Sequence, residues 1–175
     1  MQIRKNELLT EVADYYTAKQ MEHGETPQGV DWNDAGSQTL RFEQLSKIVN
    51  KPAYFTINDL GCGYGAFYDF LCNKYDKFSY AGFDISTEMV CAANQRNRND
   101  SKASFFVASE PHQVTDYGVA SGIFNVRLER PNHEWQAYIE DTLNMLNRTS
   151  RIGFAFNCLT SYSDSDKMRD YLYYA

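Results

Sequence analysis

Apolar residues recur along the chain with two different spacings, one typical of strands and one typical of helices. Short apolar runs predict buried strands over 54–60, 79–84, 103–108, 117–125 and 151–159. Apolar residues three and four apart predict helices over 5–20, 37–49, 67–71, 87–97 and 134–146. The alternation of strand and helix indicates an α/β fold, with a mostly parallel sheet in the order 3-2-1-4-5 and helices on both faces.

The first predicted strand runs into a turn with glycines at alternate positions, Gly61, Gly63 and Gly65. Glycine permits backbone angles that other residues resist, and it lets a ligand approach the main chain without meeting a Cβ. Asp59 precedes the turn, where a parallel strand delivers its side chain to the carboxyl edge of the sheet. A carboxylate at the edge where open α/β folds bind ligands favours a cation.

The glycines alone are compatible with two cofactors. Read as Gly61-x-Gly63-x-x-Ala66, with Asp84 about 20 residues on, the turn satisfies the dinucleotide fingerprint and leaves an NAD-dependent oxidoreductase as an alternative. A dinucleotide places its pyrophosphate at the helix start, where Asp59 would repel it. S-adenosylmethionine has no phosphate and presents an ammonium and a sulfonium group, so the charge favours the methyl donor.

The segment Asp59-Leu60-Gly61-Cys62-Gly63-Tyr64-Gly65 resembles the first motif of the class I S-adenosylmethionine-dependent methyltransferases. The resemblance extends from Asp59 to about Leu159. It implies a Rossmann-like three-layer sandwich in which the glycine turn, Cys62 included, underlies the methionine and ribose part of the cofactor. It also implies that Asp59 lies near the cofactor's amino group.

The end of the second predicted strand agrees with this resemblance. Asp84 stands where the family's second motif has an acid that accepts both ribose hydroxyls, and Ile85 stands where an apolar residue lies against the adenine. The alternative is that Asp84 only caps the next helix, since Ser86 and Glu88 also resemble a helix start.

Two later strand ends supply further candidates. A polar group after the third strand meets the adenine amino group in this family, and Ser109 and Glu110 are equal candidates for it here. Ala120-Ser121-Gly122 resembles the fourth motif of small-molecule enzymes, where small residues pass beside the reactive methyl. The Pro-Pro-aromatic motif of base-modifying enzymes is absent from this place, which argues against a nucleobase nitrogen as the acceptor. Asn125 and Arg127 follow and could orient an acceptor, but no catalytic base is assigned.

Residues before the first strand often fold over the cofactor in such methyltransferases. Gln38 and Arg41 share a helix face and Trp32 precedes them, so Arg41 is a candidate partner for the donor's carboxylate. A solvated helix face beside a buried Trp explains the same pattern equally well.

The chain of 175 residues suits a single domain. We expect a helical cap over 1–50, a cofactor-binding core over 51–159 and a tyrosine-rich helix over 160–175, which forms either a lid or an amphipathic surface. The last two strands of the seven-stranded methyltransferase sheet are lacking, so the fifth strand would be an open edge that invites pairing with another copy or marks a shortened chain.

The composition of the chain limits the classes of molecule that it is expected to bind. The formal net charge of −6 gives no general attraction to phosphate backbones, so no nucleic acid partner is expected. The four cysteines are scattered and predict reduced core or turn residues, with no metal site. No apolar run reaches membrane-spanning length and no signal peptide is evident, which favours the cytoplasm.

These observations predict methyl transfer from S-adenosylmethionine to an oxygen or nitrogen of a small molecule. The alternative is a module that binds the cofactor but is catalytically incomplete and serves as the partner of an active subunit.

Overall fold

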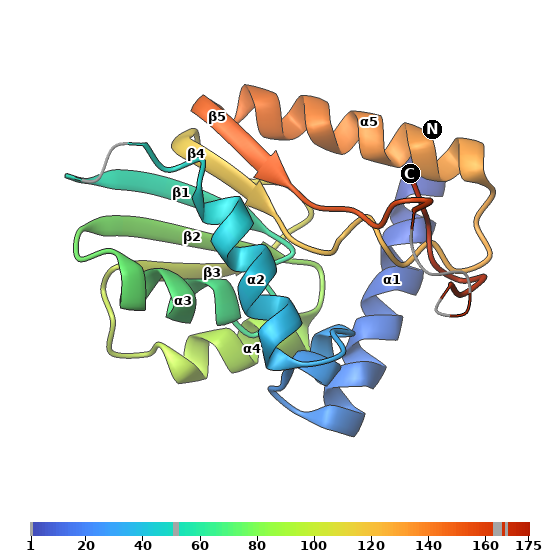
Figure 1. Cartoon of the computed structure of the whole chain (residues 1–175), viewed down its shortest axis with the longest axis horizontal. Coiled ribbons are helices and arrows are strands. Elements are labelled where there is room, and N and C mark those ends of the chain that lie inside the picture. The colour runs from blue at the N-terminus through green and yellow to red at the C-terminus, as the bar shows by residue number, and fades with distance from the viewer. Residues whose placement is uncertain (1, 51–52, 163–165, 167) are drawn as a thin grey trace.

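A computed structural model gives the structure of the chain, and it describes residues 2–50, 53–162, 166 and 168–175. Its centre is a five-stranded sheet in the order β3-β2-β1-β4-β5, in which all strand pairs are parallel. The strands are β1 (Phe55–Leu60), β2 (Phe78–Asp84), β3 (Ala103–Val107), β4 (Thr115–Ala120) and β5 (Ser150–Phe156). The predicted Rossmann-like α/β fold and its strand order are confirmed (Figure 1).

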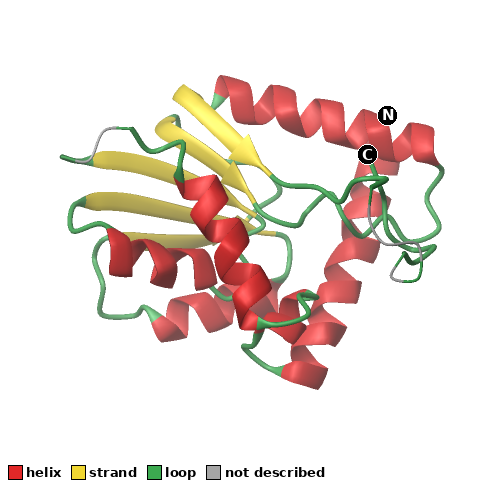
Figure 2. Ribbon diagram, in the orientation of Figure 1, coloured by secondary structure: helices red, strands yellow, loops and turns green. Residues whose placement is uncertain are grey.

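Helices cover both faces of the sheet (Figure 2). They are α1 (Gln2–His23), the 3-10 helix η1 (Pro27–Val30), α2 (Ala35–Ser46), α3 (Ala66–Lys74), α4 (Thr87–Arg96) and α5 (Asn132–Arg148). Alternate strand residues divide the core in two. Ile57 and Tyr80 pack with apolar residues of α2, α3 and α4, whereas Leu60 and Phe83 pack with Leu146 of α5. None of the described helices is long and apolar enough to cross a membrane.

Helix α1 lies beyond the carboxyl ends of the strands, beside the end of α5 and the C-terminal segment (Figure 1). Leu8 and Val12 of α1 form a buried cluster with Trp135 of α5 and Tyr173. The Trp135 indole N–H donates to the carbonyl of Phe124 at 3.0 Å. The two ends of the chain are therefore packed together over the edge at which open α/β sheets bind ligands.

Two predictions about secondary structure are wrong. The fourth strand ends at Ala120, because Gly122 has a φ of 80° and turns the chain away from the sheet. The described residues of 160–175 contain no helix, while 163–165 and 167 lie outside the described residues. Several backbone bonds of the C-terminal segment go to other segments, as in the isolated bridges of Leu172 with Val126 and of Tyr174 with Leu159.

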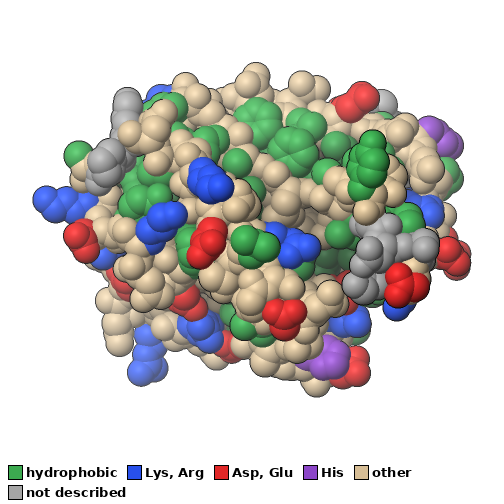
Figure 3. All heavy atoms as spheres, in the orientation of Figure 1, with side chains coloured by type: hydrophobic (Ala, Val, Ile, Leu, Met, Phe, Trp, Pro, Cys, Tyr) green, Lys and Arg blue, Asp and Glu red, His purple; other side chains and the backbone are tan. Residues whose placement is uncertain are grey.

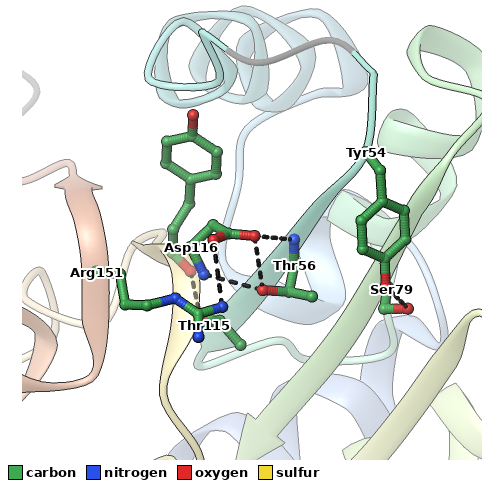
Figure 4. Close-up of polar contacts among 7 residues, drawn as sticks. Tyr54, Thr56, Ser79, Thr115, Asp116 and Arg151 are labelled. Carbon is green, nitrogen blue, oxygen red and sulfur yellow. Dashed lines mark hydrogen bonds and ion pairs between the residues drawn. The ribbon is translucent and has the colours of Figure 1, made fainter.

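The amino edge of the sheet carries a polar network that joins three strands (Figure 4). The backbone N–H and the hydroxyl of Thr56 in β1 donate to Oδ2 of Asp116 in β4, at 2.9 and 3.0 Å. Arg151 of β5 donates to the other carboxylate oxygen at 3.2 Å. Beside it, the hydroxyls of Tyr54 and Ser79 lie 2.9 Å apart.

Strand β5 is the open edge that the sequence predicts, since it pairs with β4 alone among the described strands. Ile152 and Phe156 are 39% and 40% exposed, and hydrophobic side chains gather where β5 lies in Figure 3. The cysteines are all free, but only Cys62 is buried; Cys72 and Cys91 are exposed on helices, so the prediction of core or turn residues is wrong for these two.

Candidate functional site

A cavity of about 810 Å³ lies at the carboxyl ends of β1, β2 and β4, under α1 and the N-terminal part of α2. It brings together most of the residues that the sequence singles out. Its lining includes Trp32, Gln38, Arg41, Asp59, Gly61, Cys62, Gly63, Asp84, Ile85, Ser109, Ser121 and Gly122.

Three predicted site residues do not line the cavity. Gly65 has a φ of 90° and caps the start of α3, so its role is to shape the turn. Glu110 is paired with Arg148 at 3.2 Å on the surface, which leaves Ser109 as the cavity residue of that pair of candidates. Ala120 is fully buried beneath the cavity, in the cluster that packs against α5.

The glycine turn is fixed to the neighbouring strand. The backbone N–H groups of Gly61 and Cys62 donate to the carbonyl of Phe83 in β2, at 2.7 and 3.1 Å. Gly61 has a φ of 76°, and a Cβ there would come within 2.1 Å of Cγ2 of Ile123. Any side chain at Gly61 would therefore strain the backbone and displace Ile123 from the cavity wall.

Asp59 is the most unusual group in the cavity wall. It is 1% exposed, and its Oδ2 accepts a hydrogen bond of 2.5 Å from the hydroxyl of Tyr80. Its Oδ1 is buried and has no hydrogen-bond partner among the described residues. Burial raises the pKa of Asp59 to about 7, although the Tyr80 hydrogen bond acts in the opposite direction, and the nearby Asp84 raises it further. An added cation would satisfy this carboxyl group.

Asp84 also lies at the cavity, at the tip of β2. Its carboxylate oxygens accept hydrogen bonds from the backbone N–H groups of Gly63 at 2.8 Å and Ser86 at 2.9 Å. Burial raises the pKa of Asp84, and these backbone bonds partly oppose the shift. Each oxygen keeps a second lone pair for a hydroxyl donor. The cap of α4 is made by the Ser86 hydroxyl, which accepts from the N–H of Met89 at 3.2 Å, and not by Asp84.

The segment before β1 does fold over the cavity. The guanidinium of Arg41 lies 4.5 Å from the centre of the Trp32 ring, and its Nη1 donates to the carbonyl of Ser37 at 2.9 Å. The Trp32 ring in turn covers Gly122, where a Cβ would lie 3.0 Å from Cζ2. Burial lowers the pKa of Arg41, opposed by the charge of Asp34. Because a guanidinium keeps its proton at neutral pH, Arg41 still places a cation at the cavity.

Other lining residues come from segments that carry no motif. They include Leu9, Val12 and Tyr16 of α1, Asp31, Met89, Tyr138, Thr142, Asn125, Leu159, and Tyr162, Arg169, Tyr171 and Tyr174 of the C-terminal segment. The apolar spacing of α1 indicates only a packed helix face, and nothing local relates it to the glycine turn. Of the two residues after strand four, Asn125 lines the cavity. Arg127 instead donates to the carbonyls of Arg130 and Asp170, each at 2.8 Å.

The chemistry of the cavity fits a cationic ligand with a ribose better than a diphosphate. Asp59 precedes the glycine turn and Asp84 accepts from the Gly63 N–H of that turn, so a pyrophosphate there would meet two carboxyl groups. The partnerless oxygen of Asp59 suits an ammonium donor, and Asp84 suits a pair of hydroxyls. Among the described residues, no group of three His, Cys, Asp or Glu side chains is placed to hold a metal ion.

Comparison with known proteins shows the family of this chain. Residues 57–149, more than half of the chain, match the methyltransferase domain family. A protein of Mycobacterium tuberculosis that carries the name of a methyltransferase, Rv1506c, is 57% identical over 129 residues, which are 74% of this chain and 78% of that protein.

Solved structures share the fold at low identity. The mycolic acid cyclopropane synthase CmaA1, complexed with S-adenosylhomocysteine (SAH) and CTAB, superposes with a TM-score of 0.59 at 17% identity, over 71% of this chain. The chain spans only 44% of that structure's length.

Two other SAH complexes are covered more fully. DhpI has a TM-score of 0.60 at 15% identity, over 89% of this chain and 71% of its own. The N-methyltransferase NodS of Bradyrhizobium japonicum WM9 has a TM-score of 0.56 at 17% identity, over 77% of this chain and 67% of its own length. The glycine turn, the fold and the relatives together show that the chain belongs to the class I S-adenosylmethionine-dependent methyltransferases.

Proposed function

We propose that this methyltransferase acts on an oxygen or nitrogen of a small molecule. The observation that carries the proposal is one cavity of about 810 Å³ that continues from the glycine turn to the C-terminal segment. This volume lies in the upper part of the range of about 300–1,000 Å³ typical of small-ligand sites, so it has room for a donor and a small acceptor together. Walls from α1 and the C-terminal segment favour a small acceptor over a polymer.

The donor would occupy the part of the cavity built from the strand ends. Asp59 would receive its ammonium group, the backbone of Gly61, Cys62 and Gly63 would underlie its methionine and ribose, and Asp84 would accept the ribose hydroxyls. Ile85 and Ser109 would lie at the adenine. The partnerless Oδ1 of Asp59 supports this orientation, because a buried acceptor is stabilised by a donor from the ligand.

The acceptor would lie beyond Ser121 and Gly122, beside the methyl group. The bound sulfonium makes that methyl an electrophile, so the main task of the chain is to hold the acceptor in line and to exclude water. Asn125 is suited to this task. Its Oδ1 accepts from the backbone N–H of Leu159 at 3.2 Å, and its amide nitrogen would lie 3.8 Å from a Cβ on Gly122. The amide N–H groups can therefore bind a polar atom of the acceptor and so orient the reacting atom.

Tyr162, Tyr171 and Tyr174 of the C-terminal segment line the cavity and would form part of a lid over the acceptor. We further propose that the protein works in the cytoplasm without a nucleic acid partner, in keeping with its net charge of −6. Pairing of two copies through the open edge of β5 stays a prediction, supported by the exposure of Ile152 and Phe156. The same open edge supports the second candidate function, a cofactor-binding partner of an active subunit.

Calorimetric titration with S-adenosylmethionine, SAH and NAD tests the cofactor, and a panel of small alcohols, phenols and amines with a labelled methyl donor tests the acceptor. Asn125→Ala should lower kcat at least tenfold while leaving the dissociation constant of SAH within twofold. Asn73→Ala, an exposed change on α3, is the matched control and should change neither. Donor binding without turnover across the panel would favour the partner-subunit function, and binding of NAD alone would contradict both.

A further inference from the structure

Tyr80 has a hydroxyl whose role the methyltransferase fold alone does not explain. It is 3% exposed in β2, and its ring packs against those of Tyr68 and Phe105, with centroids 5.1 and 5.5 Å away. These neighbours fix the ring on one face of the sheet. The hydroxyl reaches across to β1 and donates to Oδ2 of Asp59 at 2.5 Å.

This bond leaves the other oxygen of Asp59 without a donor. Four side-chain oxygens are buried without a partner among the described residues, on Gln20, Asn58, Asp59 and Ser150. Of these four residues only Asp59 lines the cavity. A buried acceptor left unpaired costs free energy, which a ligand donor would recover. The unpaired Oδ1 therefore points to a ligand that brings an N–H group to this position.

Within the part of the chain that the structure describes, no cationic side chain contacts Asp59. From β2 it faces Tyr80 and Asp84, and from the turn it faces Cys62, whose thiol is kept neutral because burial raises its pKa. The neighbour in β4 is the apolar Val119. Arg41 of α2 lines the same cavity but stacks on Trp32, and Asp69 of α3 adds only further negative charge near Tyr80. The ligand would thus be the cation that this carboxyl group lacks.

We propose that Tyr80 is a positioning residue for the methyl donor: its hydroxyl holds Asp59 so that Oδ1 receives the donor's ammonium group, and the carboxyl group releases its proton as the donor binds. The proton passes to solvent, the donor keeps its charge, and a carboxylate paired with an ammonium replaces a neutral buried acid. The inference rests on the donor site proposed above and not on the identity of the acceptor.

The pH dependence of SAH binding tests this inference. The pKa of Asp59 is about 7 in the free protein, and Asp59 must lose its proton when SAH binds. The affinity for SAH should therefore fall about tenfold when the pH is lowered from 8 to 6. Titration calorimetry at pH 6 in two buffers of different ionisation enthalpy should show close to one proton released. A pH-independent affinity with no proton release would overturn the proposal.

Two variants distinguish a role of Tyr80 in positioning Asp59 from a role in packing alone. Tyr80→Phe removes a hydrogen bond that favours the carboxylate, so the pH at which binding weakens should rise by about one unit and the affinity at pH 7 should fall several-fold. Tyr68→Phe is the matched control. It removes a hydroxyl from the same aromatic cluster, but that hydroxyl donates to Asp100, so the pH profile should not move. Equal profiles for both variants would mean that Tyr80 only packs.

Asp59→Asn keeps the proposal testable if Tyr80→Phe does not fold. It should weaken SAH binding at all pH values and remove the slope between pH 6 and 8. Methylthioadenosine, which has the nucleoside but no amino acid group, isolates Asp84: its affinity should be unaffected by Tyr80→Phe and nearly flat over the same range. A slope equal to that of SAH would assign the titration to Asp84 and overturn the inference, whereas binding of neither ligand would contradict the donor site itself.

Discussion

Asp59 lies at the carboxyl edge of the sheet and Asp116 near the amino edge, and the two carboxyl groups have opposite surroundings. Asp116 receives two hydrogen bonds from Thr56 and one from Arg151 (Figure 4). Burial acts to raise its pKa, but these contacts outweigh burial and hold the pKa below its ordinary value. Counting partners among the described residues, Asp59 has one hydrogen bond and one unpaired oxygen, and its pKa is about 7.

The difference shows how one sheet separates stability from function. At the amino edge, the hydrogen bonds that Asp116 accepts from Thr56 and Arg151 join β4 to β1 and β5, so the charge of Asp116 stabilises the sheet. At the carboxyl edge the acid is buried without enough partners, which destabilises the free protein and leaves an acceptor for a ligand. Substitutions at the two edges should therefore have opposite consequences.

The largest effect is expected for Asp59→Asn. Loss of the charge that meets the ammonium group should weaken SAH binding about 100-fold at pH 8, because a buried charged hydrogen bond contributes about 1.5–3 kcal/mol. The folded pKa of Asp59 is raised above the unfolded value. Its contribution to stability is thus fully present below about pH 4 and is lost as the pH rises through 7.

The same variant should consequently be more stable than the parent chain at pH 8 without ligand. We expect the free energy of unfolding to rise by up to about 4 kcal/mol in urea titrations, because about three pKa units separate the folded and unfolded forms of Asp59, and the gain to vanish near pH 4. If Asp59→Asn binds SAH as tightly as the parent chain, or loses stability at pH 8, Asp59 does not bind the ligand at the expense of stability.

The next effect is expected at the amino edge. Asp116→Ala should lower the free energy of unfolding by about 1–3 kcal/mol, because it leaves donors of Thr56 and Arg151 without their acceptor. The pKa of Asp116 is lowered in the folded chain, so its contribution is present above the unfolded pKa of about 3.9 and is lost as the pH falls through the folded value. The difference from the parent should shrink on acidification.

Binding serves as the second measurement for this variant. SAH affinity of Asp116→Ala should stay within twofold of the parent, because the network lies at the edge of the sheet away from the cavity. Asp76→Ala, at an exposed loop position, is the control and should change stability by less than about 0.5 kcal/mol. A tenfold loss of SAH affinity in Asp116→Ala would show that the two edges are not independent.

The fold was largely predictable because its signals are local. Strand and helix spacings differ, and parallel strands joined by helices leave few possible orders. The sequence places the end of β4 too late, because the apolar run 117–125 continues through Gly122, where only the backbone angle marks the turn. The pattern of the C-terminal segment predicts a helix, because it cannot reveal that the N–H of Tyr173 bonds to the carbonyl of Asn125, far away in the sequence.

The candidate site likewise contains residues that the sequence indicates and residues that it does not. Asp59, the glycine turn and Asp84 belong to motifs at strand ends, and the sequence indicates where such ends meet. Tyr80 gave no signal, because an aromatic residue in a strand is typical of a core. Its bond to Asp59 depends on the register that sets Tyr80 opposite Ile57, two residues before the acid on the same face. The contribution of α1 likewise depends on packing that no local pattern records.

The smallest effect is expected for Arg41, which tests whether the cap over the cavity belongs to the donor site. If Arg41 meets the donor's carboxylate, Arg41→Gln should weaken SAH binding about threefold to tenfold and leave methylthioadenosine binding unchanged, since that ligand has no carboxylate. Arg41→Lys should recover part of the affinity for SAH, because it keeps the charge but loses the planar stack on Trp32. Arg148→Gln, an exposed change remote from the cavity, is the matched control. Equal losses for both ligands would instead mean that Arg41 only supports Trp32 over Gly122, and the cap would then act by packing alone.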